Sequence, residues 1–344
     1  MQGIIIAILA FGLLIFIHEL GHYIAAKLCG INIQEFAIGM GPKLFGIKKG
    51  ETLYSIRILP FGGYLKIEGE DKSSDSISSR SFRNKPKWQR LTVALAGSFM
   101  NIMLGFIIVI YLVSSSDSMP SMEISGFMDK SISNNYGLKK GDKILKIGGY
   151  SVNTKKDFWH IMISVPVDKT DVLVARDGKK VNIKDVKFPV IKDNQNNVIG
   201  IMIDFEIGRK EKDIGSVIEY SFQNIIGDAK LILVSLSKLI TGQYGIKSFG
   251  GPIQVTKSMG EFYQFGLKSL LSFIAFITVN LGFMNLLPLP ALDGGKVVFI
   301  FIEIIKGKPV NPKYEGYIHL VGLILFMMLS IIVTYNDIIK IFFK

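Results

Sequence analysis

Two histidines and a glutamate lie inside an apolar run that is long enough to cross a membrane. The run spans residues 3–28, and its charged or readily charged side chains are His18, Glu19, His22 and Lys27. On a helix, positions i and i+4 share a face, so both imidazoles point toward the same place. Zn²⁺ accepts imidazole nitrogen, and the intervening glutamate can act as general base on the attacking water. Ionisable groups at this depth are usually functional, so the spacing predicts a zinc peptidase that works inside the bilayer.

A third ligand is expected, because catalytic zinc sites usually have three protein ligands. Asp293 is the strongest candidate, in the sequence Asn-Leu-Leu-Pro-Leu-Pro-Ala-Leu-Asp-Gly-Gly that begins at Asn285. Pro288 and Pro290 cannot sustain a helix, so we expect an extended chain here. Such backbone at membrane depth is tolerated only where it is buried in protein or lines a wet cavity. We therefore expect Asp293 at the metal and Asn285 near a substrate carbonyl or oxyanion, the alternative being that Asp293 caps the next helix.

Three other potential ligands suit the site less well. His160 belongs to a soluble region and is expected to be an ordinary helix residue, and His319 begins the fourth apolar run and is expected at the membrane interface. Cys29, the one cysteine, excludes an internal disulfide and is expected to be a small buried hydrophobic residue.

The composition indicates a membrane protein. The chain has 344 residues, 49% of them hydrophobic, with a mean hydropathy of +0.38. Its net charge of +12 is typical of lysine and arginine near headgroups; no nucleic-acid-binding motif is present, so no nucleic-acid partner is expected. The first run lacks the features of a cleaved signal peptide and should be retained. Four runs reach the roughly 20 residues that span a bilayer, namely 3–28, 91–113, 267–287 and 317–335.

Loop charge predicts the orientation in the membrane. Residues 29–90 have an excess of lysine and arginine over acidic residues, and the short loop 288–316 also contains several lysines. The positive-inside rule places both in the cytoplasm. Both termini and residues 114–266 would then be extracytoplasmic, with the metal site nearer the cytoplasmic side of the cell membrane.

The first cytoplasmic loop is predicted to contain β-structure. Residues 33–69 are short β-type stretches separated by glycines and prolines, which is typical of hairpins. Their apolarity suggests that they associate with the membrane, where the strands must pair with each other. The serine-rich stretch 70–80 is predicted to be mobile.

Residues 120–205 are predicted to form an inserted α+β module. Residues 137–149 resemble the signature of PDZ domains, which bind an extended peptide at a sheet edge; the alternative is a generic spacer. Residues 214–240 have the spacing of an amphipathic helix at the membrane surface, and the sequence Gly-Gly-Pro at 250–252 breaks the chain. Strands are expected at 143–147, 171–175, 181–183 and 198–203, and a helix at 155–163. The predicted divisions are 1–113, 120–205, 213–265 and 266–344.

The two separated motifs together resemble the site-2 protease family of intramembrane metalloproteases, most closely the RseP-type bacterial branch. The resemblance implies that His18, His22 and Asp293 bind one Zn²⁺ and that Glu19 is catalytic. It also implies that the early loop receives the substrate as an added strand. The residues that would help to bind substrate are Asn285, Pro288, Gly62 and Gly63. Implied substrates are single-pass membrane proteins such as anti-sigma factors, and signal-peptide remnants.

The chain departs from the family pattern at a few positions. One PDZ-like module is found where some relatives have two. Ser98 stands where relatives often have proline, and Lys296 where many have histidine. No predicted ligand and no predicted base is lost.

Two other classes of function compete with the protease. One is a PDZ-bearing membrane adaptor with a non-catalytic metal site, against which the intact Glu19 argues. The other is a zinc transporter, which would favour further ionisable groups along a path through the other spans. The sequence predicts neither the identity of the substrate nor the oligomeric state.

Overall fold

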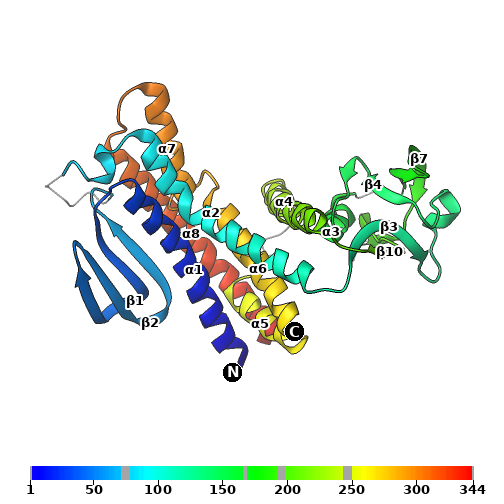
Figure 1. Ribbon diagram of the computed structural model, residues 1–344, viewed down its shortest axis with the longest axis horizontal. Coiled ribbons are helices and arrows are strands. Elements are labelled where there is room, and N and C mark those ends of the chain that lie inside the picture. The colour runs from blue at the N-terminus through cyan, green and yellow to red at the C-terminus, as the bar shows by residue number, and fades with distance from the viewer. Residues whose placement is uncertain (1, 71–77, 166–168, 193–197, 243–249, 343–344) are drawn as a thin grey trace. The chain divides into compact units, whose positions relative to one another are not determined.

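The computed structural model describes residues 2–70, 78–165, 169–192, 198–242 and 250–342. These residues form two compact units (Figure 1). The first unit comprises Met1–Gly105 and Thr241–Lys344, and the second comprises Phe106–Ile240. Most of the stretch predicted to be mobile, 71–77, lies outside the described residues.

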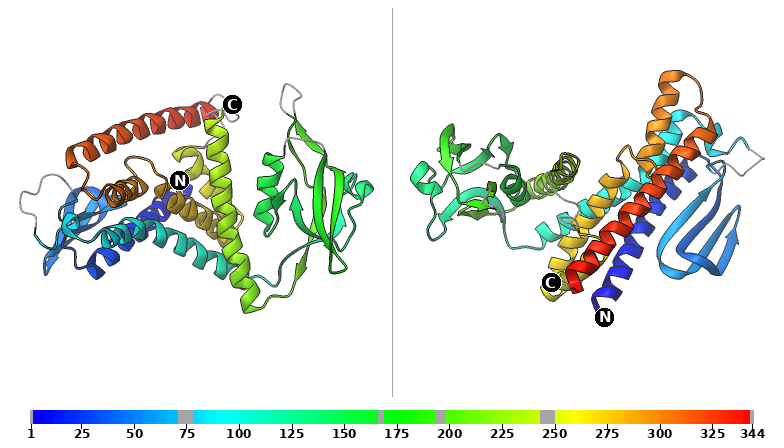
Figure 2. Two further views of the ribbon diagram at one scale, coloured as in Figure 1. Left: turned by 90° about the horizontal axis from the view of Figure 1, so that it is seen from above. Right: turned by 180° about the vertical axis from the view of Figure 1, so that it is seen from behind.

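Among the described residues, four helices are long and apolar enough to cross a membrane, which confirms the predicted polytopic helical architecture. They are α1 (Gln2–Leu28), α2 (Lys87–Ser114), α6 (Leu267–Asn285) and α8 (Pro312–Phe342). The start of α1 and the end of α8 lie at the same end of the first unit, as an even number of spans requires (Figures 1 and 2). α6 ends two residues earlier than predicted, since the chain already turns ahead of Pro288. α8 extends beyond the predicted 317–335 at both ends.

Two shorter α-helices also belong to the described part of the first unit, and the first of them was not predicted. α5 (Pro252–Gln264) follows the predicted break, with Gly251 as N-cap residue and proline in the first turn. Its first amides are capped from another helix, because the buried Asp337 carboxylate of α8 accepts hydrogen bonds from the backbone N–H of Gly251 (3.0 Å) and Gln254 (2.9 Å). α7 (Asp293–Lys306) starts at the predicted metal ligand.

The segment 286–292 joins α6 to α7, and the prediction that it is extended is wrong. It is a series of tight turns, in which Leu289 N–H donates to Leu287 O (2.7 Å) and Leu292 N–H donates to Leu289 O (3.3 Å). Ala291 has a φ of 73°, a left-handed conformation that costs a non-glycine residue on the order of 1 kcal/mol. The prolines do prevent a helix, but the chain folds back on itself instead of lengthening.

The early loop is one β-hairpin made of two long, bent strands, β1 (Ile33–Lys49) and β2 (Thr52–Ile67), where shorter stretches were predicted. Glu35 lies opposite both Lys66 and Leu53, so the first half of β1 pairs with both halves of β2. Gly39 and Gly62 have φ values of 85° and 84°, and the strands bend there instead of ending. Residues 62–67, the outer segment, therefore form one edge of this sheet, and no third strand pairs with them in the described chain. β2 lies beside α1 (Figure 1).

A half-buried carboxylate holds the bent strands together. Glu35 accepts hydrogen bonds from Ser55 Oγ (2.6 Å), Tyr64 OH (2.6 Å) and an Arg57 guanidinium nitrogen (2.8 Å). Burial raises the pKa of Glu35, but these donors outweigh it and leave that pKa below its ordinary value. Burial and the neighbouring Glu35 raise the pKa of Tyr64 to about 12. Since Tyr64 belongs to the outer segment, this cluster fixes the outer segment against β1.

The second unit is an α+β module. Its described elements are β3 (Met119–Phe127), β4 (Lys143–Ile147), β5 (Tyr150–Ser151), α3 (Lys155–Ser164), β6 (Lys169–Arg176), β7 (Lys179–Lys187), β8 (Val190–Lys192), β9 (Val198–Ile201), β10 (Phe205–Lys210) and α4 (Ile214–Ile240). Its main sheet is antiparallel, with strands in the order β10-β3-β4-β6-β7.

Most of the strands and the helix predicted for this module are found. The predicted strands lie within β4, β6, β7 and β9, except that β9 ends at Ile201, and the predicted helix lies within α3. The strands β3, β5, β8 and β10 were not predicted. The PDZ-like signature 137–149 covers a turn and β4.

The amphipathic segment predicted at 214–240 is the helix α4, and it packs on α3 of this unit. Lys156 of α3 forms an ion pair with Asp228 of α4 at 2.7 Å, and the Asp228 side chain is 1% exposed. Burial raises the pKa of Asp228, and the Lys156 ammonium opposes that rise. A partner-less carboxylate could not be buried there, so this pair fixes α4 against the module.

Candidate metal centre and active site

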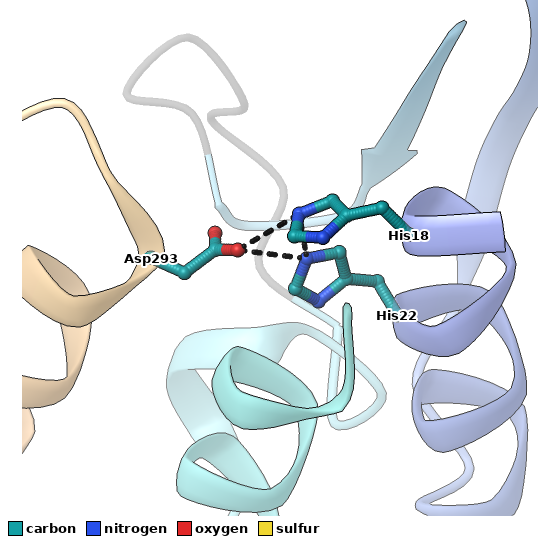
Figure 3. A group of neighbouring side chains, drawn as sticks. All are labelled: His18, His22 and Asp293. Carbon is teal, nitrogen blue, oxygen red and sulfur yellow. Dashed lines mark hydrogen bonds and ion pairs between the residues drawn. The ribbon is translucent and has the colours of Figure 1, made fainter. Parts of the chain in front are cut away.

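The three predicted zinc ligands converge on one point in the first unit (Figure 3). Asp293 Oδ2 lies 3.0 Å from His18 Nε2 and 3.1 Å from His22 Nε2, and the two imidazole nitrogens are 3.2 Å apart. The histidines project from adjacent turns of α1, and Asp293 projects toward them from the first turn of α7. Its carboxylate therefore faces the imidazoles, and no side chain caps α7 at its N-cap residue Leu292.

The hydrogen bonds of the imidazoles leave lone pairs free at this point. His22 Nδ1 lies 2.7 Å from the Val93 carbonyl oxygen, which can only accept, so Nδ1 carries the proton and Nε2 presents a lone pair. His18 Nδ1 lies 3.3 Å from the Asn101 amide nitrogen, and Asn101 Oδ1 is buried without a partner. With that amide rotated by 180°, Oδ1 accepts a hydrogen bond from His18 Nδ1–H. His18 Nε2 is then also unprotonated.

This donor set suits a divalent metal ion. Two imidazole nitrogens and a carboxylate oxygen, with outer partners that fix the imidazole tautomers, are typical of catalytic zinc sites. Ligand atoms at zinc distances in a tetrahedron are about 3.3 Å apart, close to the separations of 3.0–3.2 Å found here. Without a cation, three lone pairs would face one another at these distances. The site residues therefore fit zinc.

A glycine in α2 makes room for this arrangement. A Cβ added at Gly97 would lie 2.3 Å from His22 Nε2 and 2.8 Å from His18 Cε1. A Cβ at Gly21 of α1 would lie 2.4 Å from the Ala96 carbonyl oxygen. The two glycines let α1 and α2 approach closely, which brings the Val93 carbonyl within reach of His22.

Glu19 and the outer segment of the hairpin border the same pocket, which has a volume of about 150 Å³. A Cβ at Gly63 would lie 3.7 Å from Glu19 Cγ, an ordinary van der Waals distance. The edge of the sheet therefore passes directly beside Glu19. The lining residues include His18, Glu19 and His22 of α1, Tyr64, Leu65 and Ile67 of the outer segment, Glu70, and Asp293 and Lys296 of α7.

Two further residues fix the position of Asp293 and of the turn that precedes it. Lys296 Nζ lies 3.6 Å from Asp293 Oδ1, and His319 Nδ1 accepts a hydrogen bond from the strained Ala291 N–H (3.0 Å). The Lys296 ammonium favours the ionised form of the Asp293 carboxyl, which is the form that can bind a metal ion.

The remaining predicted residues lie at different distances from the metal site. Gly62 and Gly63 are buried in the outer segment beside it. Asn285 ends α6, and Pro288 lies exposed in the turn segment; neither is among the described residues that line the pocket. Their roles in substrate binding stay predictions.

The histidine and cysteine judged unlikely to bind metal do not join the cluster. His160 lies on α3 of the other unit, where it is buried and packs edge-on against Tyr150. Cys29 is a buried free thiol, and burial raises its pKa. His319 is not merely interfacial as predicted, because it supports the turn before Asp293.

Sequence reasoning missed most of the supporting residues. Asn101 and Gly97 lie near Ser98, but the family pattern marks only Ser98 and Lys296, as departures. Glu70 belongs to the stretch predicted to be mobile, although it forms an ion pair with Lys296. The i, i+4 rule that identified the histidines has no equivalent for contacts between helices.

Comparison with known proteins gives a consistent result across the chain. The model of peptidase family M50 matches residues 6–329. A Clostridium acetobutylicum protein with a provisional name as a zinc metalloprotease is 38% identical over 342 residues, covering 98% of this chain and 97% of the relative. The regulator of sigma-W protease RasP of Bacillus subtilis is 32% identical over 420 residues, covering 98% and 99%. The zinc metalloprotease RasP of Bacillus licheniformis is 30% identical over 425 residues, covering 99% and 100%.

Proposed function

The chain belongs to peptidase family M50, the site-2 protease family, and is an intramembrane zinc metalloprotease; from this premise we propose that it hydrolyses peptide bonds within the transmembrane segments of single-pass membrane proteins. The observation that carries the proposal is the convergence of His18, His22 and Asp293 on one point within a bundle of membrane-spanning helices. These three residues would hold one zinc ion. The relative named as a regulator of sigma-W suggests anti-sigma factors as one substrate class, with signal-peptide remnants as another.

The proposed chemistry assigns Glu19 the proton transfers. Zinc, when bound, polarises the scissile carbonyl and acidifies the attacking water. Glu19, which lines the same pocket as the three ligands, accepts the proton of that water and delivers it to the leaving amine. Val93 O and Asn101 keep the imidazoles oriented throughout.

The outer segment is the proposed binding surface for the substrate backbone. A transmembrane helix cannot be attacked while its peptide groups are hydrogen-bonded to one another, so it must unwind locally. The open edge of residues 62–67 offers main-chain partners to an extended peptide, directly beside Glu19. A side chain at Gly63 would meet the Ala37 carbonyl oxygen at 2.8 Å and Glu19 Cγ at 3.7 Å, so glycine lets the strand pass close to both. Asn285 and Pro288 would hold the substrate from the other side of the cleavage position.

We further propose the cell membrane as location, with the orientation that the loop charges predict. Residues 29–90 and 288–316 would be cytoplasmic, and both termini and residues 114–266 extracytoplasmic. The PDZ-like module would then meet substrates outside the membrane. It would admit those already trimmed there, either by binding a new C-terminus or by excluding bulky ectodomains.

The proposal is tested with purified protein and single-span membrane peptides, with products read by mass spectrometry. Wild type should cleave within the apolar segment, and Glu19→Gln should not, although it retains zinc. Glu68→Gln is the matched control, since Glu68 is a buried glutamate outside the pocket and its variant should cleave like wild type. Wild type with bound zinc that leaves every such peptide intact would contradict the proposal.

A further inference from the structure

Lys296 lies between two carboxylates at the metal site. Its Nζ atom is 2.5 Å from Glu70 Oε1 and 3.6 Å from Asp293 Oδ1. The side chains of Lys296 and Glu70 are 35% and 24% exposed, whereas that of Asp293 is 12% exposed. Lys296 and Glu70 therefore lie nearer to solvent than Asp293 does. The proposed mechanism gives no role to Lys296 or to Glu70.

The two partners of Lys296 belong to different parts of the site. Asp293 precedes Lys296 by one turn of α7, where residues i and i+3 are neighbours. Glu70 lies three residues after the end of the outer segment, and its backbone N–H donates to Ile67 O (3.3 Å) to close a turn. Lys296 is therefore the connection between the helix that carries a metal ligand and the strand edge proposed for the substrate.

The lining of the pocket contains the side chains of Glu19, Glu70, Asp293 and Lys296. An ammonium so close to a cation site is unfavourable by Coulomb energy alone, so its position calls for another physical reason.

We propose that Lys296 is a positioning residue that directs the Asp293 carboxylate toward the metal and couples it, through Glu70, to the outer segment of the hairpin. By engaging Oδ1, the ammonium leaves Oδ2 turned toward His18 and His22. Metal binding and the order of the strand edge then depend on each other, and by linkage each strengthens the other. The inference rests on the proposed zinc ligands.

The sign of one change in affinity distinguishes positioning from simple electrostatics. Zinc affinity is measured on the full-length protein in detergent, by competition with a chromophoric chelator. Lys296→Met removes a positive charge, so electrostatics alone would tighten zinc binding. Positioning predicts the opposite, a loss of about tenfold or more, as for other partners of metal ligands. Lys296→Arg keeps the charge and the reach and should remain within about threefold of wild type.

A double-mutant cycle tests the connection through Glu70. Glu70→Gln should weaken zinc binding several-fold by itself, and should add little in the Lys296→Met background, because both variants break one chain of contacts. Glu303→Gln is the matched control on the same helix. Glu303 pairs with Arg90 at 2.6 Å, with side chains 8% and 12% exposed, away from the pocket. That variant should lower the melting temperature and leave zinc affinity unchanged.

Hydrogen exchange provides a readout that does not depend on catalysis. Adding zinc to the wild-type apoprotein should slow exchange of the amides in 62–70, and this protection should be lost in Lys296→Met. Three results would each overturn the inference. They are tighter zinc binding by Lys296→Met, additive effects of the two substitutions on zinc affinity, and amide exchange in 62–70 that does not change when zinc is added. None of these results bears on whether wild type cleaves membrane peptides, so the proposed function succeeds or fails separately.

Discussion

Replacement of Gly97 by alanine should disable the metal centre while leaving the fold largely intact. The added Cβ would lie 2.3 Å from His22 Nε2, whereas ordinary van der Waals contact begins near 3.4 Å. The imidazole or α2 must therefore move by about 1 Å. Metal sites tolerate deviations of only about 0.2 Å in ligand distance. Zinc affinity should thus fall at least about 100-fold, or about 2.8 kcal/mol.

Gly105→Ala is the matched control for this substitution. Gly105 lies on the same helix, and a Cβ there would also meet its nearest neighbour at 2.3 Å, but that neighbour is the Val279 methyl group of α6. Both variants gain about 1 kcal/mol of helix propensity, which offsets part of the steric cost. Gly105→Ala should therefore destabilise by packing alone, with no effect on zinc affinity in the folded protein.

The assay compares thermal unfolding with zinc affinity for the two variants and wild type. Gly97→Ala should lose zinc with little loss of apoprotein stability, and Gly105→Ala should show the reverse. Gly97→Ala that binds zinc within threefold of wild type would refute the reasoning, since α2 would then not define the position of His22.

Three other expected outcomes follow from contacts around the site. Asn101→Leu removes the buried amide beside His18 and should weaken zinc binding 10–100-fold by chelator competition, whereas Asn101→Asp keeps an acceptor and should bind zinc nearly as well as wild type. His319→Phe removes the acceptor for Ala291 N–H and should cost about 1 kcal/mol in denaturant unfolding. The pKa of Glu35 is lowered on folding, so its contribution to stability is present above the pKa of an unfolded carboxyl and is lost as pH falls through the lowered value. Melting temperatures between pH 7 and about pH 3 should fall less steeply in Glu35→Gln, and equal slopes would contradict the role of its donors.

The convergence of His18, His22 and Asp293 was predictable because their placement depends largely on local rules. Helical periodicity alone places His18 and His22 on one face, whatever packs against them. Asp293 followed from the need for a third ligand and from the prolines before it. The prolines did not reveal the conformation, because tight turns and extended backbone exclude a helix equally well. The turn seen at Ala291 is stabilised by His319, which is distant in sequence.

The supporting contacts were not predictable because each depends on how separate elements pack. Val93 reaches His22 only because two glycines bring α1 and α2 together, and a backbone carbonyl has no signature in the sequence. The hairpin shows the same limit. Glycines at 39 and 62 suggested strand ends, yet a positive φ also lets a strand bend while pairing continues. The bent form depends on Glu35, whose carboxylate accepts hydrogen bonds from Ser55 in the first half of β2 and from Tyr64 in the second half.

The metal site therefore combines parts of unequal rigidity. Its histidines belong to one long helix and are fixed by partners in the neighbouring α2, so their positions change little unless the helices separate. Asp293 belongs to a short helix after a strained turn, and its position depends on side chains from α8 and from the end of the hairpin. The position of Asp293 therefore depends on more separate elements than the positions of His18 and His22 do. The turn before Asp293 is held from α8, and its ion-pair partner Lys296 is held by Glu70 after the hairpin.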